Sequence, residues 1–311
     1  MMRTDMSVFT VLAENLKFPE GPVSMPDGSV LVVELARGTL TRVGTDGSVR
    51  VVAELGGAPN GAAIGPDGAA YITNCGGNSW HLVDGLLYPG ARPDDFVGGS
   101  IQRVDLETGE VRTLYRSCGD NPLNGPNDLV FDRTGHFYFT DHGKSHDRMR
   151  DHGVVYYASP DGRSIEQLIY PLLTPNGIAL DADETTLYVA ETAPGRVLSF
   201  PLARPGVLAD PVQASGIGLL RNPVASLHGR VTGLEMLDSI AVDAAGRICA
   251  GLIDAPHGGI AIFSGAREME VIRLPDPVVT NLCFDVRDSS KAYVTLSASG
   301  RLVSVPWPSG G

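Results

Sequence analysis

Six amide and carboxylate side chains in this sequence occupy equivalent places in a phrase that recurs along the chain. The phrase opens with a short turn, continues as an apolar run and an Asp-x-x-Gly-like turn, and ends in a β-rich run. It reads PEGPVSMPDGSVLVVE from Pro19 and PNGAAIGPDGAAYITN from Pro59, and it returns in two further clear copies and two weaker ones. Each copy carries one side chain that could bind a ligand or take part in a reaction, and we call these six residues the anchors. They are Glu20, Asn60, Asn127, Asn176, Asp238 and Asn281.

Four of the anchors have the chemistry of a site for a hard cation. Together they present carboxylate and amide oxygens with two formal negative charges, and these are the ligands that calcium prefers, at about 2.3–2.6 Å. Convergent carboxylates without a cation would repel one another and lose solvation, so an ion is the economical interpretation. The four predicted metal ligands are Glu20, Asn127, Asn176 and Asp238.

The alternative interpretation is that these phrases contain only turn formers. Asn-Gly pairs such as Asn60-Gly61 are common in turns for conformational reasons alone, although turn chemistry does not select Glu20. Six protein ligands would leave little room for a substrate. Asn60 and Asn281 are therefore interpreted as substrate contacts or structural residues.

Short antiparallel strands are the elements that must position the anchors. The anchors lie 40 to 67 residues apart, and each interval holds two alternating runs around a turn followed by one or two more, such as GTLTRVGTDGSVRVVAEL. Four strands in about 40–50 residues are typical of one blade of a β-propeller. Six copies predict an all-β, six-bladed β-propeller with four antiparallel strands per blade, occupying residues 1–311 as a single domain. A large β-sandwich is the alternative, but it does not explain the same turn at the start of every unit.

This architecture would bring the anchors together. The innermost strand of each blade lines the central channel, and each anchor opens such a strand, so all six converge at one end of the channel. The loops between second and third strands overhang that end. We expect the N-terminal run SVFTVLAENL to close the ring as a strand of the blade built by residues 280–307. The overhanging loops are 34–38, 75–99, 141–152, 192–195 and 254–258.

The overhanging loops supply the expected substrate contacts. Loop 75–99 is the longest and is rich in aromatic and apolar residues, as is typical of a lid or binding loop. His142 directly follows a strand end and should face the channel mouth, whereas Lys144 is expected to be a rim charge. The predicted substrate-binding residues are Asn60, Trp80, His81, His142 and His257.

Composition and charge argue against several other classes of protein. The 38 Gly and 22 Pro among 311 residues disfavour helical architectures, because both residues destabilise helix interiors. A net charge of −12 argues against nucleic acid or an anionic membrane as partner. The sequence shows no CxxC pair, secretory signal or transmembrane run, so a cytoplasmic protein is expected, with its oligomeric state left open. Serine esterase, nucleotide and dinucleotide motifs are also missing.

The motifs PEGP, GPND, TPNG and LDSIAVD give the whole chain a resemblance to a known family. The sequence resembles the senescence marker protein (regucalcin), gluconolactonase and luciferin-regenerating enzyme family and, more distantly, diisopropyl fluorophosphatase. The resemblance implies a six-bladed propeller that hydrolyses a small lactone or related ester with one divalent cation in its channel. Calcium is the expected ion, with zinc, manganese and ferrous iron as alternatives. The implied ligands of the cation are again Glu20, Asn127, Asn176 and Asp238.

One motif departs from the pattern of the sugar lactonases. In those enzymes the block before the third anchor often reads Arg-x-Asn-Asp, and the Arg contacts sugar hydroxyls. Here the block is Gly125-Pro126-Asn127-Asp128, which lacks the Arg. Together with the apolar loop 75–99, this departure argues for a less hydroxylated substrate than gluconolactone.

The leading hypothesis is a metal-dependent hydrolase of a lactone or small cyclic ester. The cation would polarise the carbonyl as a Lewis acid and stabilise the oxyanion. Asp238 is the first candidate for the base that activates water and Asp128 is the second, with covalent attack by Asp238 left open. The alternatives are a metal-dependent isomerase, cyclase or phosphotriesterase that uses the same site, and a non-catalytic calcium-binding propeller.

Overall fold

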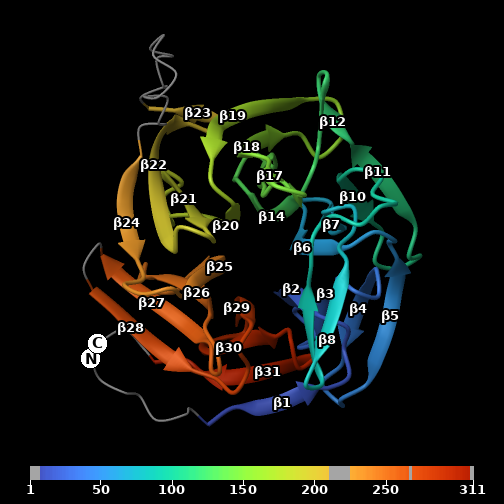
Figure 1. Ribbon diagram of the computed structural model, residues 1–311, viewed down its shortest axis with the longest axis vertical. Helices are drawn as coiled ribbons and strands as arrows, with labels where there is room; N and C mark the ends of the chain where they lie inside the picture. The colour runs from blue at the N-terminus through green and yellow to red at the C-terminus, as the bar shows by residue number, and fades with distance from the viewer. Residues whose placement is uncertain (1–7, 210–224, 266–267, 309–311) are drawn as a thin grey trace.

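The protein is a ring of six β-sheets around a central axis (Figure 1). The computed structural model describes residues 8–209, 225–265 and 268–308. Each sheet is one blade of an all-β, six-bladed β-propeller, and its neighbouring strands are antiparallel. The predicted architecture is therefore confirmed. In the described ranges, no helix is long and apolar enough to cross a membrane.

The first three blades each contain four strands. Listed from the axis outward, the first blade is β2 (Pro19–Ser24), β3 (Val30–Glu34), β4 (Thr39–Val43) and β5 (Val49–Glu54). The second is β6 (Pro59–Ile64), β7 (Ala70–Asn74), β10 (Ser100–Val104) and β11 (Val111–Tyr115). The third is β14 (Pro126–Phe131), β15 (Phe137–Asp141), β18 (Gly153–Ala158) and β19 (Ile165–Leu172).

The other three blades follow the same plan with one addition. The fourth is β20 (Pro175–Leu180), β21 (Thr186–Glu191) and β22 (Arg196–Arg204), and β22 pairs with both β23 (Val207–Leu208) and β24 (Ser226–Arg230). The fifth is β25 (Met236–Val242), β26 (Ile248–Ile253), β27 (Gly259–Gly265) and β28 (Glu268–Arg273). The sixth is β29 (Val279–Asp285), β30 (Asp288–Leu296), β31 (Arg301–Pro306) and β1 (Thr10–Ala13).

The ring closes where the two ends of the chain share the sixth blade. Strand β1 pairs antiparallel with β31, and Thr10 lies opposite Ser304. Figure 1 shows β1 along the outer edge of this blade, beside the first blade. The prediction that the N-terminal run closes the last blade is confirmed, although the strand itself covers only part of that run.

The core lies between the faces of neighbouring blades. All residues of β3 and β15 are buried, because both faces of these strands are covered. Strands covered on both faces lose the alternation of polar and apolar residues. Between the second and third blades, for example, the rings of Tyr71 and Phe137 have centroids 5.9 Å apart. This packing holds the second strands of neighbouring blades against each other.

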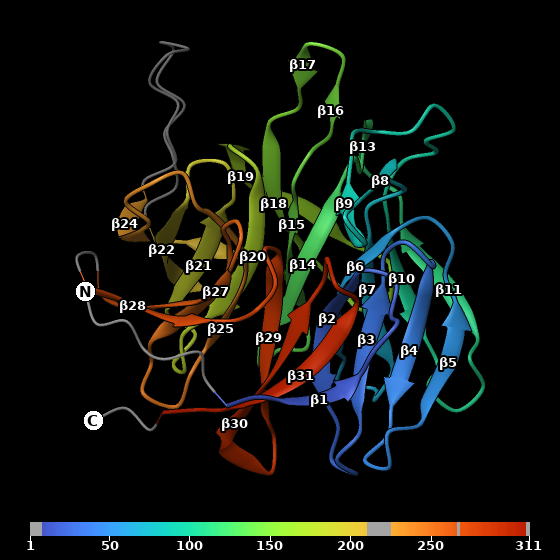
Figure 2. The same ribbon diagram turned by 60° about the horizontal axis from the view of Figure 1, so that its bottom comes forward.

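Three small hairpins extend the loops on one face of the ring. Figure 2 shows them rising above the same end of the blades. The long loop 75–99 contains one of them, and loop 141–152 contains another, so both predicted overhanging loops carry local structure. The hairpins are β8 (Trp80–Val83) with β9 (Leu86–Pro89), β12 (Ser117–Cys118) with β13 (Asn121–Pro122), and β16 (Ser145–His146) with β17 (Met149–Arg150).

Candidate functional site

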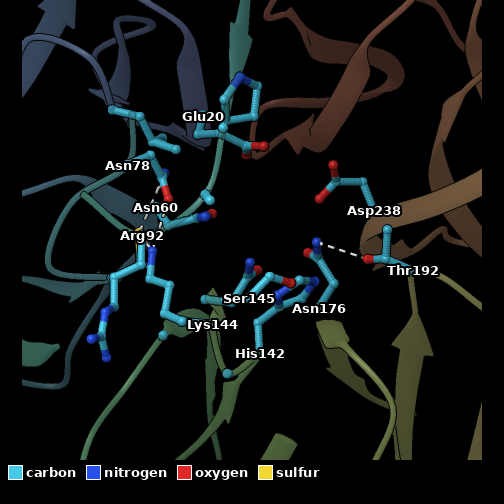
Figure 3. A pocket seen from close by; sticks show the side chains of 18 of the residues that line it. Glu20, Asn60, Asn78, Arg92, His142, Lys144, Ser145, Asn176, Thr192 and Asp238 are labelled. Carbon is cyan, nitrogen blue, oxygen red and sulfur yellow. Dashed lines mark hydrogen bonds between the residues drawn. The ribbon is translucent and has the colours of Figure 1, made fainter. Parts of the chain in front are cut away.

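Every innermost strand is irregular at its anchor. Along β2, regular pairing stops at Glu20, opposite Val33, and resumes at Val23, opposite Leu31. Three residue intervals on β2 therefore face two on β3. The same break occurs in β6, β14, β20, β25 and β29. A bulge of this kind twists the strand and changes the direction of its side chains. Figure 3 shows the anchors Glu20, Asn60, Asn176 and Asp238 around one open space.

Buried hydroxyl groups of the second strands hold the innermost strands in place. In β7, Thr73 Oγ1 donates a hydrogen bond to the carbonyl of Asn127 in the next blade. In β15, Thr140 Oγ1 accepts the backbone N–H of Asp128 at 3.1 Å and donates to the carbonyl of Asn176 in the following blade at 2.6 Å. These hydroxyls fix the backbone of neighbouring anchors relative to each other.

Three asparagine anchors each have an amide oxygen without a hydrogen-bond partner. The Oδ1 atoms of Asn60, Asn127 and Asn176 are buried and have no partner among the residues that the structure describes. The Nδ2 group of Asn176 donates to Thr192 Oγ1 at 3.1 Å, which leaves its oxygen as the free end of the amide (Figure 3). Buried polar atoms are rarely left unsatisfied, because each costs about 1–3 kcal/mol. The three oxygens therefore indicate a ligand that accepts their lone pairs.

Three buried carboxyl groups lie close enough to influence one another. Burial, followed by repulsion from Asp238 and Asp128, raises the pKa of Glu20 well above its ordinary value. Burial raises the pKa of Asp128 to about 7, even with Ser239 and Asn281 beside it. Burial and repulsion from Asp128 raise the pKa of Asp238 to about 7. A positive charge between these groups would relieve the repulsion and stabilise their ionised forms.

The donor set fits a hard divalent cation. Such an ion would pair with the free amide oxygens and offset the carboxylate charges, and oxygen donors suit calcium better than softer metals. Among the residues that the structure describes, no group of three or more His, Cys, Asp or Glu could hold a metal ion. A cation at this place therefore depends on the amide oxygens as much as on the carboxylates. The residues that could hold it are Glu20, Asn127, Asn176 and Asp238.

Five of the six anchors, all but Asn281, line a pocket of about 240 Å³ together with the overhanging loops. Four of the five predicted overhanging loops contribute to it, the exception being 254–258. The volume is below the range of about 300–1,000 Å³ that is usual for drug-sized ligands, so the pocket suits a small molecule. The predicted site residues that line it are Glu20, Asn60, Asn127, His142, Asn176 and Asp238.

Three predicted substrate contacts lie outside the pocket lining. Trp80 packs on Phe18, with ring centroids 5.3 Å apart, and Phe18 itself lines the pocket. Because side chains alternate along a strand, the neighbouring His81 is exposed on the other side of β8. His257 is also exposed, and its carbonyl accepts a hydrogen bond from Arg273. Trp80 therefore supports the pocket wall, and the two imidazoles are not brought to it.

Lys144 is the residue whose position differs most from the expected one. It is only 7% exposed instead of lying on the rim. Its Nζ donates to the carbonyl of Gly77 and to Asn78 Oδ1, both at 2.8 Å, and to Cys75 Sγ at 3.2 Å. Lys144 thereby joins loop 75–99 to loop 141–152. The sequence placed it in an overhanging loop, but its burial depends on a loop that is remote along the chain.

His142 lines the pocket as a neutral imidazole. Arg150 donates to its Nδ1 at 2.6 Å and to its carbonyl at 2.9 Å. A guanidinium only donates, so Nδ1 is an acceptor and the ring hydrogen lies on Nε2. Burial and then the charge of Arg150 lower the pKa of His142 to about 3. The side chain is therefore a fixed hydrogen-bond donor across the neutral range.

Comparison with known proteins adds information on ancestry. The family model described as SMP-30/Gluconolactonase/LRE-like region matches residues 18–298. A gluconolactonase of Zymomonas mobilis subsp. mobilis is 26% identical, with the alignment covering 95% of this chain and 80% of the relative.

Two solved structures have the same fold at low sequence identity. A gluconolactonase from Xanthomonas campestris aligns with a TM-score of 0.73 and 23% identity, covering 97% of this chain and 90% of the other. A calcium-binding protein, regucalcin, from Agrobacterium tumefaciens aligns with a TM-score of 0.71 and 18% identity, covering 96% and 93% of the two chains. At these identities, the likeness bears on the fold alone.

Proposed function

This chain belongs to the SMP-30/gluconolactonase/LRE-like family, and from that premise we propose that it is a divalent-cation-dependent hydrolase that opens a small lactone. The observation that carries the proposal is the set of buried, unpartnered amide oxygens beside three carboxyl groups with raised pKa values. A 26% identical relative named as a gluconolactonase supports the reaction class. The regucalcin structure, which is named as calcium-binding, supports calcium as the first ion to test.

Glu20, Asn127, Asn176 and Asp238 are the proposed ligands of the cation. When bound, a divalent cation supplies Lewis-acid polarisation of the lactone carbonyl and stabilises negative charge on its oxygen. The chain itself positions these donors through the bulged inner strands and the hydroxyls of Thr73 and Thr140. Little rearrangement of the protein is then needed to hold the ion.

Asp238 is the proposed base for the attacking water. It lines the pocket, whereas Asp128 lies behind the lining and acts on Asp238 through its charge. With the cation bound Asp238 would be ionised, and a carboxylate at the pocket lining can accept the proton of a water beside it. His142 contributes a donor at Nε2, which we assign to a substrate oxygen because Arg150 occupies Nδ1. The alternative mechanism at the same site is direct attack of the Asp238 carboxylate on the carbonyl carbon.

Elemental analysis followed by a lactone assay tests this proposal. The purified full chain is supplied with calcium, dialysed, and analysed for bound metal, then assayed on δ-gluconolactone, δ-valerolactone and γ-butyrolactone in ¹⁸O-labelled water with and without a chelator. We expect about one cation per chain, incorporation of solvent oxygen into the ring-opened acid, and loss of turnover with the chelator. A bound cation without any turnover would instead favour a calcium-binding propeller, and no stoichiometric cation would contradict the metal site.

The substitution Asp238→Asn tests the chemical role separately from cation binding. We expect kcat/KM to fall by roughly 10²–10⁴-fold, because the proton acceptor is lost, while the remaining ligands retain part of the cation affinity. Asp46→Asn is the matched control, since this carboxylate lies in an exposed turn where it accepts the N–H of Ser48. Full activity of Asp238→Asn would remove Asp238 from the chemistry.

A further inference from the structure

One wall of the pocket carries three cationic side chains, here called the basic wall: Arg92, Lys144 and Arg150. In the part of the chain that the structure describes, no carboxylate oxygen lies within 4.0 Å of their charged nitrogens. Nine other arginines in the described ranges pair with a carboxylate within this distance, as Arg247 does with Asp243 at 2.6 Å. In a chain with 36 acidic and 24 basic residues, the grouping of three such cations on one small pocket gives this wall a positive charge.

Lys144 is the buried member of the basic wall. Its three hydrogen-bond acceptors are the sulfur of Cys75, the carbonyl of Gly77 and the amide oxygen of Asn78. The carboxylate of Asp141 lies nearby, but it accepts the backbone N–H groups of Asn124, Gly125 and Gly143. A buried ammonium without a paired anion is costly. Lys144 and Asp141 attract each other through space without an ion pair, and a negatively charged group in the pocket would gain from the same ammonium.

Arg150 is the member with free donors at the pocket mouth. Nη1 donates to Ser145 Oγ at 2.7 Å, and Nη2 donates twice to His142. Since a guanidinium has five N–H donors, Nε and one Nη1 hydrogen are left for a ligand. The carboxylate of Asp151 is occupied by Asn124 and by the backbone N–H of Lys144. Arg150 is thus held in one orientation by neutral partners, and Asp151, which makes no ion pair with it, offsets its charge only through space.

The basic wall faces the proposed catalytic end of the pocket. Figure 3 shows Lys144 across the open space from Asp238, with the Arg92 side chain farther out on the same side. The two ends share a pocket of about 240 Å³, so one small molecule meets both. A lactone whose carbonyl lies at the anchors places the other end of the molecule near the basic wall.

We propose that the substrate is a lactone bearing a carboxylate, which the basic wall binds through Arg150 and stabilises through the charge of Lys144. This inference rests on the proposed lactone hydrolysis and names its substrate class. A charge-assisted hydrogen bond contributes about 1.5–3 kcal/mol, which corresponds to a preference of about 10- to 100-fold over a neutral analogue. The preference resides in binding an anion, so it should weaken as ionic strength rises.

A pair of matched lactones tests the inference. The probes are 5-oxotetrahydrofuran-2-carboxylate and its neutral isostere 5-oxotetrahydrofuran-2-carboxamide, assayed with the calcium-loaded full chain. We expect kcat/KM to be at least about 10-fold higher for the carboxylate. The substitution Arg150→Gln should reduce that ratio toward one while leaving hydrolysis of the carboxamide measurable. Arg148→Gln, in the same loop but outside the pocket lining, is the charge-matched control and should keep the ratio.

Further variants keep the test independent of folding and of the proposed function. Lys144→Met removes hydrogen bonds that join two loops. The carboxylate-to-carboxamide ratio is therefore also measured for Arg92→Gln, at the exposed mouth of the pocket. Hydrolysis of the carboxamide as fast as the carboxylate overturns the inference and leaves lactone hydrolysis intact. If neither lactone is opened, the proposed function fails, and calorimetric titration with tetrahydrofuran-2-carboxylate still decides the anion site. Binding that Arg150→Gln abolishes supports the site, and no binding to the unsubstituted chain overturns it.

Discussion

Asparagines of this chain differ in what their amide oxygens contact, and that difference separates structural residues from site residues. Asn74 Oδ1 accepts the N–H groups of Ala58 and Gly76, and its Nδ2 donates to the carbonyl of Gly56. Asn74 is therefore fully used in holding a turn. Asn127 and Asn176 have the same side chain, but their buried Oδ1 atoms have no partner. A turn-forming role alone accounts for the first residue and not for the other two.

The carboxyl groups of the site should make cation binding depend on pH. In the cation-free folded protein, Asp128 and Asp238 have pKa values of about 7, whereas an unfolded Asp titrates near 4. Between these values the folded state holds more protons, so the contribution of these groups to stability falls as pH rises from about 4 to 7. Calcium needs the ionised forms, so its binding displaces these protons. We expect the calcium-induced increase in Tm to be larger at about pH 8 than at about pH 5.5.

Thermal unfolding with calcium and with a chelator at the two pH values measures this effect. In Asp238→Asn one of the titrating groups is gone, so the difference between the two pH values should shrink. An increase in Tm that is equal or larger at the lower pH would contradict proton–cation competition at these carboxyl groups.

At the scale of elements, polar side chains at the ends of second strands brace the turns that precede the anchors. Glu34, at the end of β3, accepts the N–H of Lys17 at 2.7 Å, and Glu191, at the end of β21, accepts that of Leu173 at 2.5 Å. Asp141, at the end of β15, accepts the N–H groups of the two residues that precede Pro126. Each brace fixes where an innermost strand begins and therefore where its anchor lies.

The substitution Asp141→Asn tests one such brace. The carboxylate now accepts hydrogen bonds from three backbone N–H groups. An amide at this position would point its own NH₂ donor at one or more of them. We expect the free energy of unfolding to fall by about 2–4 kcal/mol and calcium affinity to weaken, because Asn127 follows this turn directly. Chemical denaturation and calorimetric calcium titration measure the two effects.

Asp161→Asn serves as the control for this substitution. Asp161 is exposed in a surface turn, where it accepts a hydrogen bond from Ser159 Oγ. Its replacement should change stability by about 0.5 kcal/mol or less. Unchanged stability and unchanged calcium affinity in Asp141→Asn would show that the turn does not need this brace.

On the scale of the whole molecule, the ring depends on a contact between the two ends of the chain. Strand β1 contributes Ala13 to a buried cluster that also contains Val30 and Val32 of the first blade and Leu302 of the sixth. The innermost strands of the first and sixth blades, β2 and β29, also pack together. Because the blades surround a shared channel, a loosened junction between these two blades would affect the placement of Glu20.

Deletion of residues 1–14 tests the closing strand. It removes β1, which exposes the edge of β31 and part of the cluster around Leu302. We expect Tm to fall by at least about 5 °C, corresponding to a loss of a few kcal/mol. Differential scanning calorimetry measures the shift, and deletion of residues 1–7 alone is the control. A Tm that stays unchanged after removal of residues 1–14 would show that the strand is dispensable.

The sequence by itself determined the repeat, and the repeat determined the fold. Each phrase combines a turn with an alternating run, and this local pattern predicts the strands of a blade, whose core then forms against the neighbouring blades. Six equivalent positions then predicted that Glu20, Asn127, Asn176 and Asp238 would face one channel. The same reasoning placed His142 at the mouth, where it lines the pocket.

Only the tertiary structure decided which loop residues reach the pocket. His81 is turned outward by the pairing of β8 with β9, and Lys144 is buried by loop 75–99, which lies far from it in sequence. The lack of an ion pair at Arg150 likewise depends on how the loops place Asp151, which accepts hydrogen bonds from Asn124 and Lys144 instead. Loop positions follow from contacts between remote segments, and a local pattern carries no record of those contacts. The strand pattern therefore predicts the scaffold and its anchors, whereas the shape and charge of the pocket wall arise only when the loops pack.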